Sequence, residues 1–318
     1  MTDALTHALD GLPRPIALIA HLGAGPGEAL DRWRASGAET VLLVEAEPEA
    51  AAELSARAAG DKRVKVVHAA VSADPRPRPF HVANFADLSS LRAPAPALRE
   101  LFPGLRIVSD EVVTPRDPVS VLGESLPGED RGSALLVLET PGETLGILEA
   151  LEKADALHRF DAICLQEGVE PLHDGAAPLA EIRDRLARAG YDLRDEAQPE
   201  DPDRPRLIAR LDRAALRLRE LKTETEAQKA EIARLRDAAK ASEAELGTLR
   251  EANAAAKTEI AALAKAQGEL KTLREALTTA EAARDTAESR LRQTRAEMLR
   301  AEGQIRLLRD LLIDGPLP

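Results

Sequence analysis

The stretch IALIAHLGAGPG, residues 16–27, joins an apolar run to a glycine-rich turn and leads into a helical pattern. A second apolar run at residues 41–44 follows, and it ends at the acidic residue Glu45. A turn without side chains lets backbone N–H groups approach a ligand closely, and an acid about 20 residues further on accepts hydrogen bonds from ribose hydroxyls. The order of strand, glycine turn, helix, strand and acid therefore predicts a site for a nucleoside-bearing cofactor.

The spacing of the glycines narrows the choice of cofactor. Folds that bind dinucleotides need a third glycine three positions after the second, with two residues between them, whereas Gly27 comes two positions after Gly25, with only Pro26 between them. This shorter spacing is similar to that of methyltransferases that use S-adenosylmethionine. A plain turn between a strand and a helix is the alternative, and Glu45 makes the cofactor interpretation the stronger one.

Short apolar runs alternate with amphipathic stretches from residue 13 to residue 211. The expected strands are residues 16–20, 41–44, 64–67, 135–138, 161–165 and 207–211, and the clearest expected helices are residues 48–59, 143–157 and 178–189. Such alternation predicts an α/β fold, with a doubly wound, mostly parallel sheet and helices on both faces. The proline-rich stretches at residues 75–79, 94–103 and 115–127 predict long irregular connections.

Composition and charge limit the classes of function. The chain has 318 residues, 44% of them apolar, and this is enough for a core. One cysteine, Cys164, excludes an internal disulfide and a cysteine-cluster metal site, and the histidines show no metal-ligand spacing. The net charge of −12 and the absence of aromatic residues after Tyr191 argue against nucleic acid as a partner. No apolar run of about 18 residues and no signal-like N-terminus occurs, and a reducing, cytoplasmic setting is expected.

The segment after residue 211 has the spacing of a coiled coil. No proline occurs between Asp212, a good helix N-cap, and Pro316, and apolar residues recur at steps of three and four. At Leu270 two steps of three follow each other without a step of four between them, and this break in the heptad pattern is a stammer. A continuous helix of roughly 100 residues would be about 150 Å long. We therefore divide the chain into an N-terminal extension (1–12), an α/β domain (13–211), a coiled-coil helix (212–314) and a tail (315–318).

A single apolar stripe on so long a helix requires a partner helix. In the first half Glu224, Glu231 and Glu245 lie five residues before the basic residues Lys229, Arg236 and Arg250. In a parallel in-register dimer each of these glutamates faces the basic residue of the other helix, and Asn253 in the seam favours a pair of two helices. In the second half the same pairing would place Arg290 against Arg295 and Glu297 against Glu302. A hairpin that folds back near Gly268 and a different protein partner are therefore alternatives to the parallel dimer. A homodimer through a parallel coiled coil is the main expectation. A solvated single helix is the weaker alternative.

Further segments of the α/β domain resemble class I methyltransferases, and among them the FkbM type. The residues that carry the resemblance are the glycine turn, Glu45, Ala69-Ala70-Val71-Ser72, Asn84-Phe85-Ala86-Asp87-Leu88-Ser89-Ser90-Leu91 and Glu139-Thr140-Pro141-Gly142. The last group lies where the family has Asp-Val-Glu-Gly, and His21 stands where an acid usually opens the glycine motif. The resemblance covers about residues 13–211 and does not include the coiled coil.

The resemblance implies S-adenosylmethionine as cofactor and assigns roles to matching positions. Gly23, Gly25 and Gly27 would form the cofactor loop, and Glu45 would hold the ribose hydroxyls. The backbone of His68, Ala69 and Ala70 would lie against adenine. Such a site requires Glu45 to point toward the glycine turn and the cleft to stay open.

Methyl transfer needs mainly an acceptor held in line with the methyl group, and a base only when a hydroxyl must lose its proton. Glu139, His21 and Glu167 at strand ends are the candidates for that base. Strand-end carboxylates are more often solvated, and a histidine beside a glycine turn more often satisfies the backbone.

Two functions follow from these observations. The first is an O-methyltransferase that acts on a small-molecule or glycan hydroxyl and dimerises through its coiled coil. The second is an inactive methyltransferase-fold scaffold or binding protein whose coiled coil mediates assembly. By analogy of layout alone, the coiled coil could also be a spacer, as in bifunctional methyltransferases of surface-polysaccharide synthesis.

Overall fold

The computed structural model describes residues 4–128, 132–195 and 201–313. Two compact units, Met1–Thr223 and Glu224–Pro318, are described separately. We call the first unit the head. The strands are β1 (Ile16–Leu22), β2 (Thr40–Glu45), β3 (Val64–His68), β4 (Arg78–Ala83), β5 (Ile107–Val113), β6 (Ser133–Leu138), β7 (Ala162–Gln166), β8 (Tyr191–Asp195) and β9 (Arg206–Leu211). The helices of the head are α1 (Ala4–Asp10), α2 (Leu30–Ala35), α3 (Pro48–Ala58), α4 (Pro96–Leu101), α5 (Pro118–Leu122), α6 (Thr144–Lys153) and α7 (Leu179–Arg188), with short 3-10 turns at Ala86–Leu88, Gly123–Ser125 and Leu157–Arg159.

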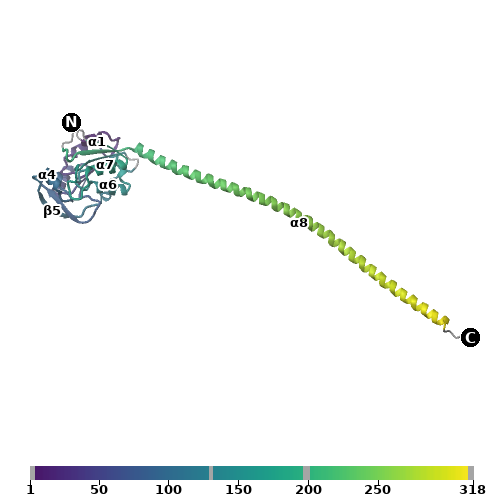
Figure 1. Ribbon diagram of the computed structural model, residues 1–318. Helices are drawn as coiled ribbons and strands as arrows, with labels where there is room; N and C mark the ends of the chain where they lie inside the picture. The colour runs from purple at the N-terminus through teal and green to yellow at the C-terminus, as the bar shows by residue number, and fades with distance from the viewer. Residues whose placement is uncertain (1–3, 129–131, 196–200, 314–318) are drawn as a thin grey trace. The chain divides into compact units, whose positions relative to one another are not determined.

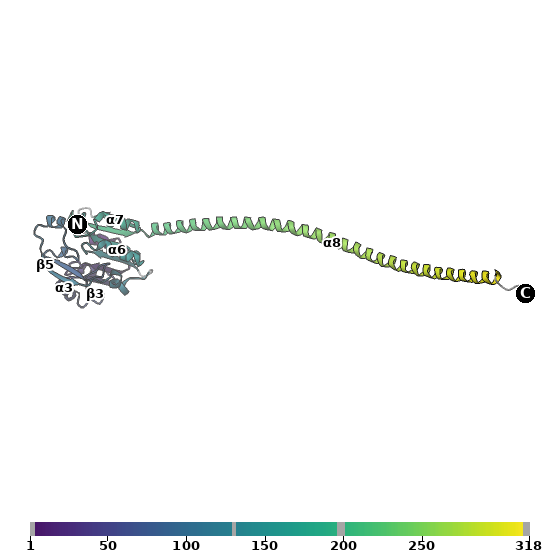
Figure 2. The same ribbon diagram turned by 60° about the horizontal axis from the view of Figure 1, so that its bottom comes forward.

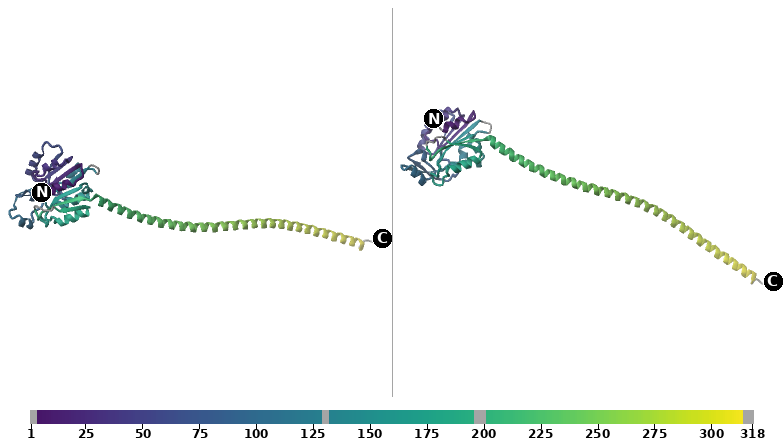
Figure 3. Two further views of the ribbon diagram at one scale, coloured as in Figure 1. Left: turned by 90° about the horizontal axis from the view of Figure 1, so that it is seen from above. Right: turned by 45° about the horizontal axis from the view of Figure 1, so that its top comes forward.

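Seven strands form one sheet in the order β3-β2-β1-β6-β7-β9-β8. Strands β3, β2, β1, β6 and β7 are parallel, and β9 is antiparallel to both β7 and β8. Figure 3 shows the strands of the N-terminal third, in purple, beside the teal strands of the same sheet. The strand order reverses between β1 and β6, which is where ligands bind in open α/β sheets.

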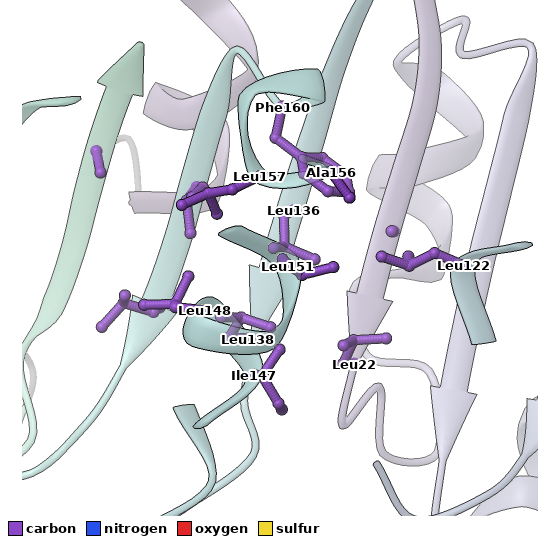
Figure 4. Packing of buried hydrophobic residues seen from close by; sticks show 14 of the residues in the cluster. Leu22, Leu122, Leu136, Leu138, Ile147, Leu148, Leu151, Ala156, Leu157 and Phe160 are labelled. Carbon is purple, nitrogen blue, oxygen red and sulfur yellow. The ribbon is translucent and has the colours of Figure 1, made fainter. Parts of the chain in front are cut away.

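Apolar side chains cover both faces of this sheet. One cluster packs Ile147, Leu148 and Leu151 of α6 onto Leu136 and Leu138 of β6 (Figure 4). The other face is covered by α1, α2 and α3, with Trp33 fully buried. The predicted α/β class with a doubly wound, mostly parallel sheet is therefore confirmed.

The six strands and three helices expected from the apolar runs are all present, and their ends differ from the expected ones by at most four residues. The expectation of irregular connections at the proline-rich stretches is wrong in part. Pro96 and Pro118 begin α4 and α5, because proline at the first helical position has the required backbone angle and lacks only an N–H that would stay unpaired. The segment treated as an extension before residue 13 contains α1, whose Ala4, Leu5, Ala8 and Leu9 are buried.

Strands β4 and β5 pair with each other in a separate antiparallel ribbon. The connection between them, residues 84–106, holds a small core of its own with Leu88, Leu98 and Leu105, which also contains Leu172 from the segment after β7. Ser90 Oγ donates to the Pro141 carbonyl at 2.7 Å, and Arg92 Nη1 donates to the Gly175 carbonyl at 2.8 Å. The connection thereby packs at the carboxyl ends of β6 and β7.

The C-terminal helix α8 (Arg213–Ile313) is one helix of 101 residues (Figures 1 and 2). It passes through Gly268 without a break, so the hairpin alternative is wrong. Asp212 Oδ1 accepts a hydrogen bond from Ala215 N at 2.8 Å, which is the N-cap that the sequence predicted. Every described side chain from Arg217 onward is exposed, the leucines of the seam included. The long helix is what a coiled coil requires, and the pairing itself stays a prediction.

No helix in the described ranges is both long and apolar enough to cross a membrane. Cys164 of β7 is buried.

Candidate functional site

A cleft of about 610 Å³ opens at the carboxyl ends of the parallel strands. This volume lies within the range of small-molecule sites. Residues of β1, β2 and β7, the residues directly after β3 and after β6, and the connection at residues 84–106 line it. The cleft is therefore at the edge of the sheet where the sequence predicted a cofactor.

The glycine turn uses its three glycines differently. Gly23 has φ +82°, and a Cβ there would lie 2.0 Å from the Glu139 carbonyl oxygen, so only glycine lets β1 and β6 end side by side. Gly25 has φ +54°, and a Cβ there would meet nothing within 4 Å. Gly27, at φ +93°, would place a Cβ 2.7 Å from Leu54 Cδ1 of α3. Gly23 and Gly25 line the cleft, whereas Gly27 does not, and its role is to let the turn pack on α3.

Glu45 points toward the glycine turn. Its Oε2 accepts a hydrogen bond from Gly25 N at 2.7 Å, and its Oε1 accepts from Ala46 N and Glu47 N at 2.8 Å each. Glu45 lines the cleft although only 8% of it is exposed. The carboxylate thus ties the end of β2 to the turn after β1 and still borders the open space beside Gly25.

The residues after β3 lie at the same edge. Ala69 and Ala70 line the cleft, and Ala69 N donates to the Glu45 carbonyl at 2.9 Å. His68 is not part of the lining, because its ring is exposed and its Nε2 bonds to the Ala46 carbonyl at 3.0 Å. Of the segment expected against adenine, two residues border the cleft and the third lies outside it.

His21 and Glu139 belong to one chain of hydrogen bonds. Trp33 Nε1 donates to His21 Nδ1 at 3.4 Å, so the ring proton of a neutral His21 is on Nε2, which donates to Glu139 Oε2 at 3.1 Å. Glu139 Oε1 accepts from Arg206 Nη2 at 2.8 Å. Burial raises the pKa of Glu139, but the hydrogen bond from His21 and the charge and hydrogen bond of Arg206 outweigh it and lower the pKa to about 2. Glu139 is therefore ionised at neutral pH and is a weak base.

Glu167 occupies a second buried carboxylate site in the lining. Its Oε2 accepts from Thr144 Oγ1 at 2.8 Å, and its carboxylate also accepts from Gly142 N. Burial raises the pKa of Glu167 despite these hydrogen bonds. The structure thus brings His21, Glu139 and Glu167 to one cleft and gives each of them a partner within the protein.

Sequence reasoning missed a third buried carboxylate, Glu143. Its Oε1 accepts from Arg92 Nε at 2.8 Å, and its Oε2 accepts from Ser72 Oγ at 2.6 Å and lies 3.4 Å from Arg78 Nη2. It joins α6 to the segment after β3 and to the connection at residues 84–106. The spacing of these residues, 51 to 71 positions apart, leaves no local signal in the sequence.

His173 was also missed, and it lines the cleft while being buried. Its Nε2 donates to the Leu88 carbonyl at 3.4 Å, and its Nδ1 has no hydrogen-bond partner among the described residues. Burial lowers the pKa of His173 to about 4, so this ring is neutral at physiological pH. Within the described ranges no group of three or more His, Cys, Asp or Glu side chains is placed to hold a metal ion.

Comparison with known proteins gives similarity to solved structures only. Neither a protein-family model nor a curated protein matches the chain. An FkbM methyltransferase from Methylobacillus flagellatus is 13% identical at a TM-score of 0.39, over 61% of this chain and 43% of that one. A ribosomal protein L11 methylase from Lactobacillus delbrueckii subsp. bulgaricus is 12% identical at a TM-score of 0.34, over 64% and 76%. A putative tRNA methyltransferase from Streptococcus pneumoniae, in complex with S-adenosyl-L-methionine, is 11% identical at a TM-score of 0.38, over 73% and 91%.

The chain spans less than half the length of the FkbM structure that it resembles. The fold class of the chain rests on its own sheet order and register.

Proposed function

We propose that the head binds S-adenosylmethionine in the cleft and holds a hydroxyl of a small molecule or glycan for methylation, as an FkbM-type methyltransferase would. The observation that carries this proposal is the 2.7 Å hydrogen bond from Gly25 N to Glu45 Oε2 at the border of an open cleft. It joins the two elements that a nucleoside site needs, a carboxylate and a turn without side chains.

The residues present fit such a cofactor. The missing side chain of Gly25 leaves open space where a ligand can approach the backbone. Each oxygen of a carboxylate accepts more than one hydrogen bond, so Glu45 Oε2 can hold a ribose hydroxyl in addition to Gly25 N. Ala69 and Ala70 offer an apolar border for a base.

The bound cofactor would supply an electrophilic methyl group on a sulfonium. The protein then needs chiefly to hold the acceptor oxygen in line and to exclude water, which is a matter of positioning. Glu139 is held ionised by His21 and Arg206, and its negative charge favours a cation in the cleft. The connection at residues 84–106 also borders the cleft.

The second candidate is a scaffold that keeps the fold without catalysis. It is favoured by the hydrogen bonds of His21, Glu139 and Glu167, since each of the three expected bases is already engaged within the protein. Pro141 also stands where the family has its second acid. In this case the cleft would bind a cofactor without turnover, or bind none.

Calorimetric titration of the full chain with S-adenosylmethionine and S-adenosylhomocysteine tests the proposal. Both should bind, and Glu45→Ala should weaken S-adenosylhomocysteine binding by about tenfold or more, because charge-assisted hydrogen bonds are lost. His68→Ala is the matched control at the end of the neighbouring strand, and it should leave binding unchanged because the His68 side chain lies outside the cleft. No heat with either compound, together with unchanged stability of Glu45→Ala, would remove the enzyme proposal. Binding without methyl transfer to any hydroxyl compound would favour the scaffold.

We also propose that the first half of α8 pairs with the same segment of a second copy in a parallel dimer. The exposed seam leucines, from Leu218 to Leu263, and the complementary charges at the flanking positions support this. Sedimentation of the full chain should give an elongated species larger than a monomer, and a monomer would reject self-pairing. A cytoplasmic setting, suggested by the single buried Cys164, belongs to this proposal as well.

A further inference from the structure

The second half of α8, residues 270–312, has a seam built from two unlike rows. One row consists of large side chains that are apolar except for one arginine: Leu270, Leu277, Arg284, Leu291, Met298, Ile305 and Leu312. The other row is small between its two end leucines and consists of Leu273, Ala280, Ala287, Thr294, Ala301 and Leu308. The large apolar members of both rows are 56–83% exposed on the helix. We call these the large row and the small row.

A parallel in-register pair does not suit this seam. In that geometry each row faces itself, so that layers of two leucines alternate with layers of two alanines that leave gaps. Arg284 would face Arg284 of the second copy inside the seam. At the flanks Arg290 would face Arg295, and Glu297 would face Glu302. The alanine gaps, the Arg284 pair and the like-charge flanks are all unfavourable.

An antiparallel pair places the large row of one helix against the small row of the other. With the pair centred at Ser289, Leu277 faces Ala301, Met298 faces Ala280, and Leu291 faces Ala287 of the second copy. The inner layers then join one large and one small side chain, which fills space evenly, and the outer layers join Leu270 to Leu308 and Leu273 to Ile305. Arg284 faces Thr294 instead of another arginine.

The flanking charges select this register. In an antiparallel pair the residues that follow the small row face each other across the seam. Centred at Ser289, Arg274 faces Glu302 and Glu281 faces Arg295, and each contact occurs twice by symmetry. The remaining like pairs are Glu288 with Glu288 and Arg290 with Arg290. Glu288 already has Arg292 at 3.4 Å and Arg284 at 3.8 Å within its own chain, which offsets its repulsion.

A shift by one heptad loses these pairs. In one direction Arg274 would face Arg295 and Glu281 would face Glu288. In the other direction Arg274 would face Arg309 and Glu281 would face Glu302, while Glu288 would face Arg295 and Arg290 would face Glu297. That register has four attractive and four repulsive contacts, whereas the register centred at Ser289 has four attractive and two repulsive ones. Both alternatives place like charges at contacts where the register centred at Ser289 places opposite charges.

We propose that residues 270–312 pair antiparallel with the same segment of a second copy, centred at Ser289. The stammer after Leu270 is then the junction between a first half that pairs in parallel and a second half that pairs antiparallel. If the parallel pairing of the first halves also holds, the two interfaces together join four chains. The antiparallel pairing does not depend on what the cleft of the head binds.

Disulfide mapping in the full chain tests the direction. The double variant Ala280→Cys with Met298→Cys should, on mild oxidation, link the tryptic peptide that bears position 280 to the one that bears position 298. Eighteen residues of helix separate the two positions by about 27 Å within one chain, so this mixed link forms only between chains. Links of like with like, or no link at all, would overturn the proposal.

Two controls belong to this experiment. The double variant Ala280→Cys with Ile305→Cys moves one thiol by a heptad and should give no mixed link; a mixed link in equal yield would overturn the register. The unmodified chain should give no linked dimer, because Cys164 is buried.

A charge reversal gives an independent readout with opposite signs for the two directions. Arg295→Glu should weaken self-association about tenfold in an antiparallel pair, because two attractive contacts with Glu281 become repulsive. In a parallel pair the same change would strengthen association, since Arg290 would then face a glutamate. Glu281→Arg added to Arg295→Glu should restore the affinity, and Arg300→Glu at an outer position is the control. Sedimentation equilibrium of the unmodified full chain and of these three variants measures the affinities, and stronger association of Arg295→Glu would contradict the proposal.

Discussion

Glu139 Oε1 lies 2.8 Å from Arg206 Nη2, which joins the end of β6 to the start of β9. The other oxygen of the same carboxylate lies 3.1 Å from His21 Nε2 at the end of β1. One carboxylate therefore ties three strand ends together at the floor of the cleft. Glu139 is thereby part of the framework around the cleft.

Glu139→Gln should cost about 1–3 kcal/mol of stability at pH 7, because the charge that pairs with Arg206 is lost. Both side chains are about one quarter exposed, so solvent screens the pair only in part. The pKa of Glu139 is about 2 in the folded chain against 4.5 in the unfolded one. Its contribution is therefore complete above pH 4.5 and is lost as the pH falls toward 2. Urea unfolding followed by the fluorescence of Trp33, the single tryptophan, measures this at each pH.

The acid loss of stability should be shallower in Glu139→Gln than in the unmodified chain between pH 4.5 and 2. Glu53→Gln changes an exposed carboxylate on α3 and serves as the control, with no effect on the profile. Equal acid profiles for Glu139→Gln and the unmodified chain would contradict the assigned role of the ion pair.

Gly23→Ala and Gly25→Ala should separate folding from binding. A Cβ at Gly23 would lie 2.0 Å from a backbone oxygen, so this variant should lose about 3 kcal/mol or more, or fail to fold. A Cβ at Gly25 meets only open space, so that variant should pay about 1–2 kcal/mol for its positive φ. It should nevertheless bind S-adenosylhomocysteine at least about tenfold more weakly, because the methyl group occupies the close approach to the backbone. Calorimetry and urea unfolding of both variants test this, and tight binding by a folded Gly25→Ala would contradict it.

Much of the fold could be predicted because its signals are local. Buried parallel strands such as β1 and β6 appear as unbroken apolar runs, and α8 appears as a heptad pattern. Strands β4, β5 and β8 were missed because their sequences are polar or begin among prolines, as in Arg78–Ala83. Such a strand exists only because its pairing partner is present, and a partner far along the chain leaves no trace in a short window.

The candidate site divides in the same way. Gly23, Gly25 and Glu45 follow strand ends directly, so topology alone brings them together. The partners of His21 and Glu139 could not be foreseen, because Arg206 reaches the cleft only through the antiparallel pairing of β9 with β7. His173 gave no signal, since its burial depends on the connection at residues 84–106, whose Leu88 carbonyl accepts from its ring.

The unmodified chain should lose stability as the pH is lowered from 6.5 to about 4, and His173→Gln should remove this loss. Burial lowers the pKa of His173 to about 4 from 6.5, despite the hydrogen bond to Leu88, and the charges of Arg204 and Arg92 add to the effect while Asp174 opposes it. Between pH 6.5 and about 4 the His173 side chain is protonated in the unfolded chain but not in the folded one. The free energy of unfolding therefore decreases by on the order of 3 kcal/mol as the pH is lowered through this range. Glutamine keeps a donor for the Leu88 carbonyl but does not titrate. Urea unfolding at pH 4 to 7 measures the slope.

The slope of His173→Gln should be smaller than that of the unmodified chain, whereas His68→Gln, at an exposed ring, should leave it unchanged. Identical slopes for His173→Gln and the unmodified chain would show that His173 is not held neutral by burial.

The packing of Gly190 against Leu216 fixes the first turn of α8 on the head. Gly190 has φ +90°, its carbonyl accepts from Asp212 N at 3.0 Å, and a Cβ there would lie 2.5 Å from Leu216 Cδ2. Gly190→Ala should therefore cost about 2–4 kcal/mol, the sum of backbone strain and a clash. Gly60→Ala, at φ +92° with nothing within 4 Å, carries the strain without the clash and should cost only about 1–2 kcal/mol. In a Leu216→Ala background the cost of Gly190→Ala should fall to that of Gly60→Ala, a coupling of about 1 kcal/mol or more in a double-mutant cycle by urea unfolding. Additive costs would mean that Leu216 does not pack against Gly190 in solution, and this contact would then not hold the first turn of α8.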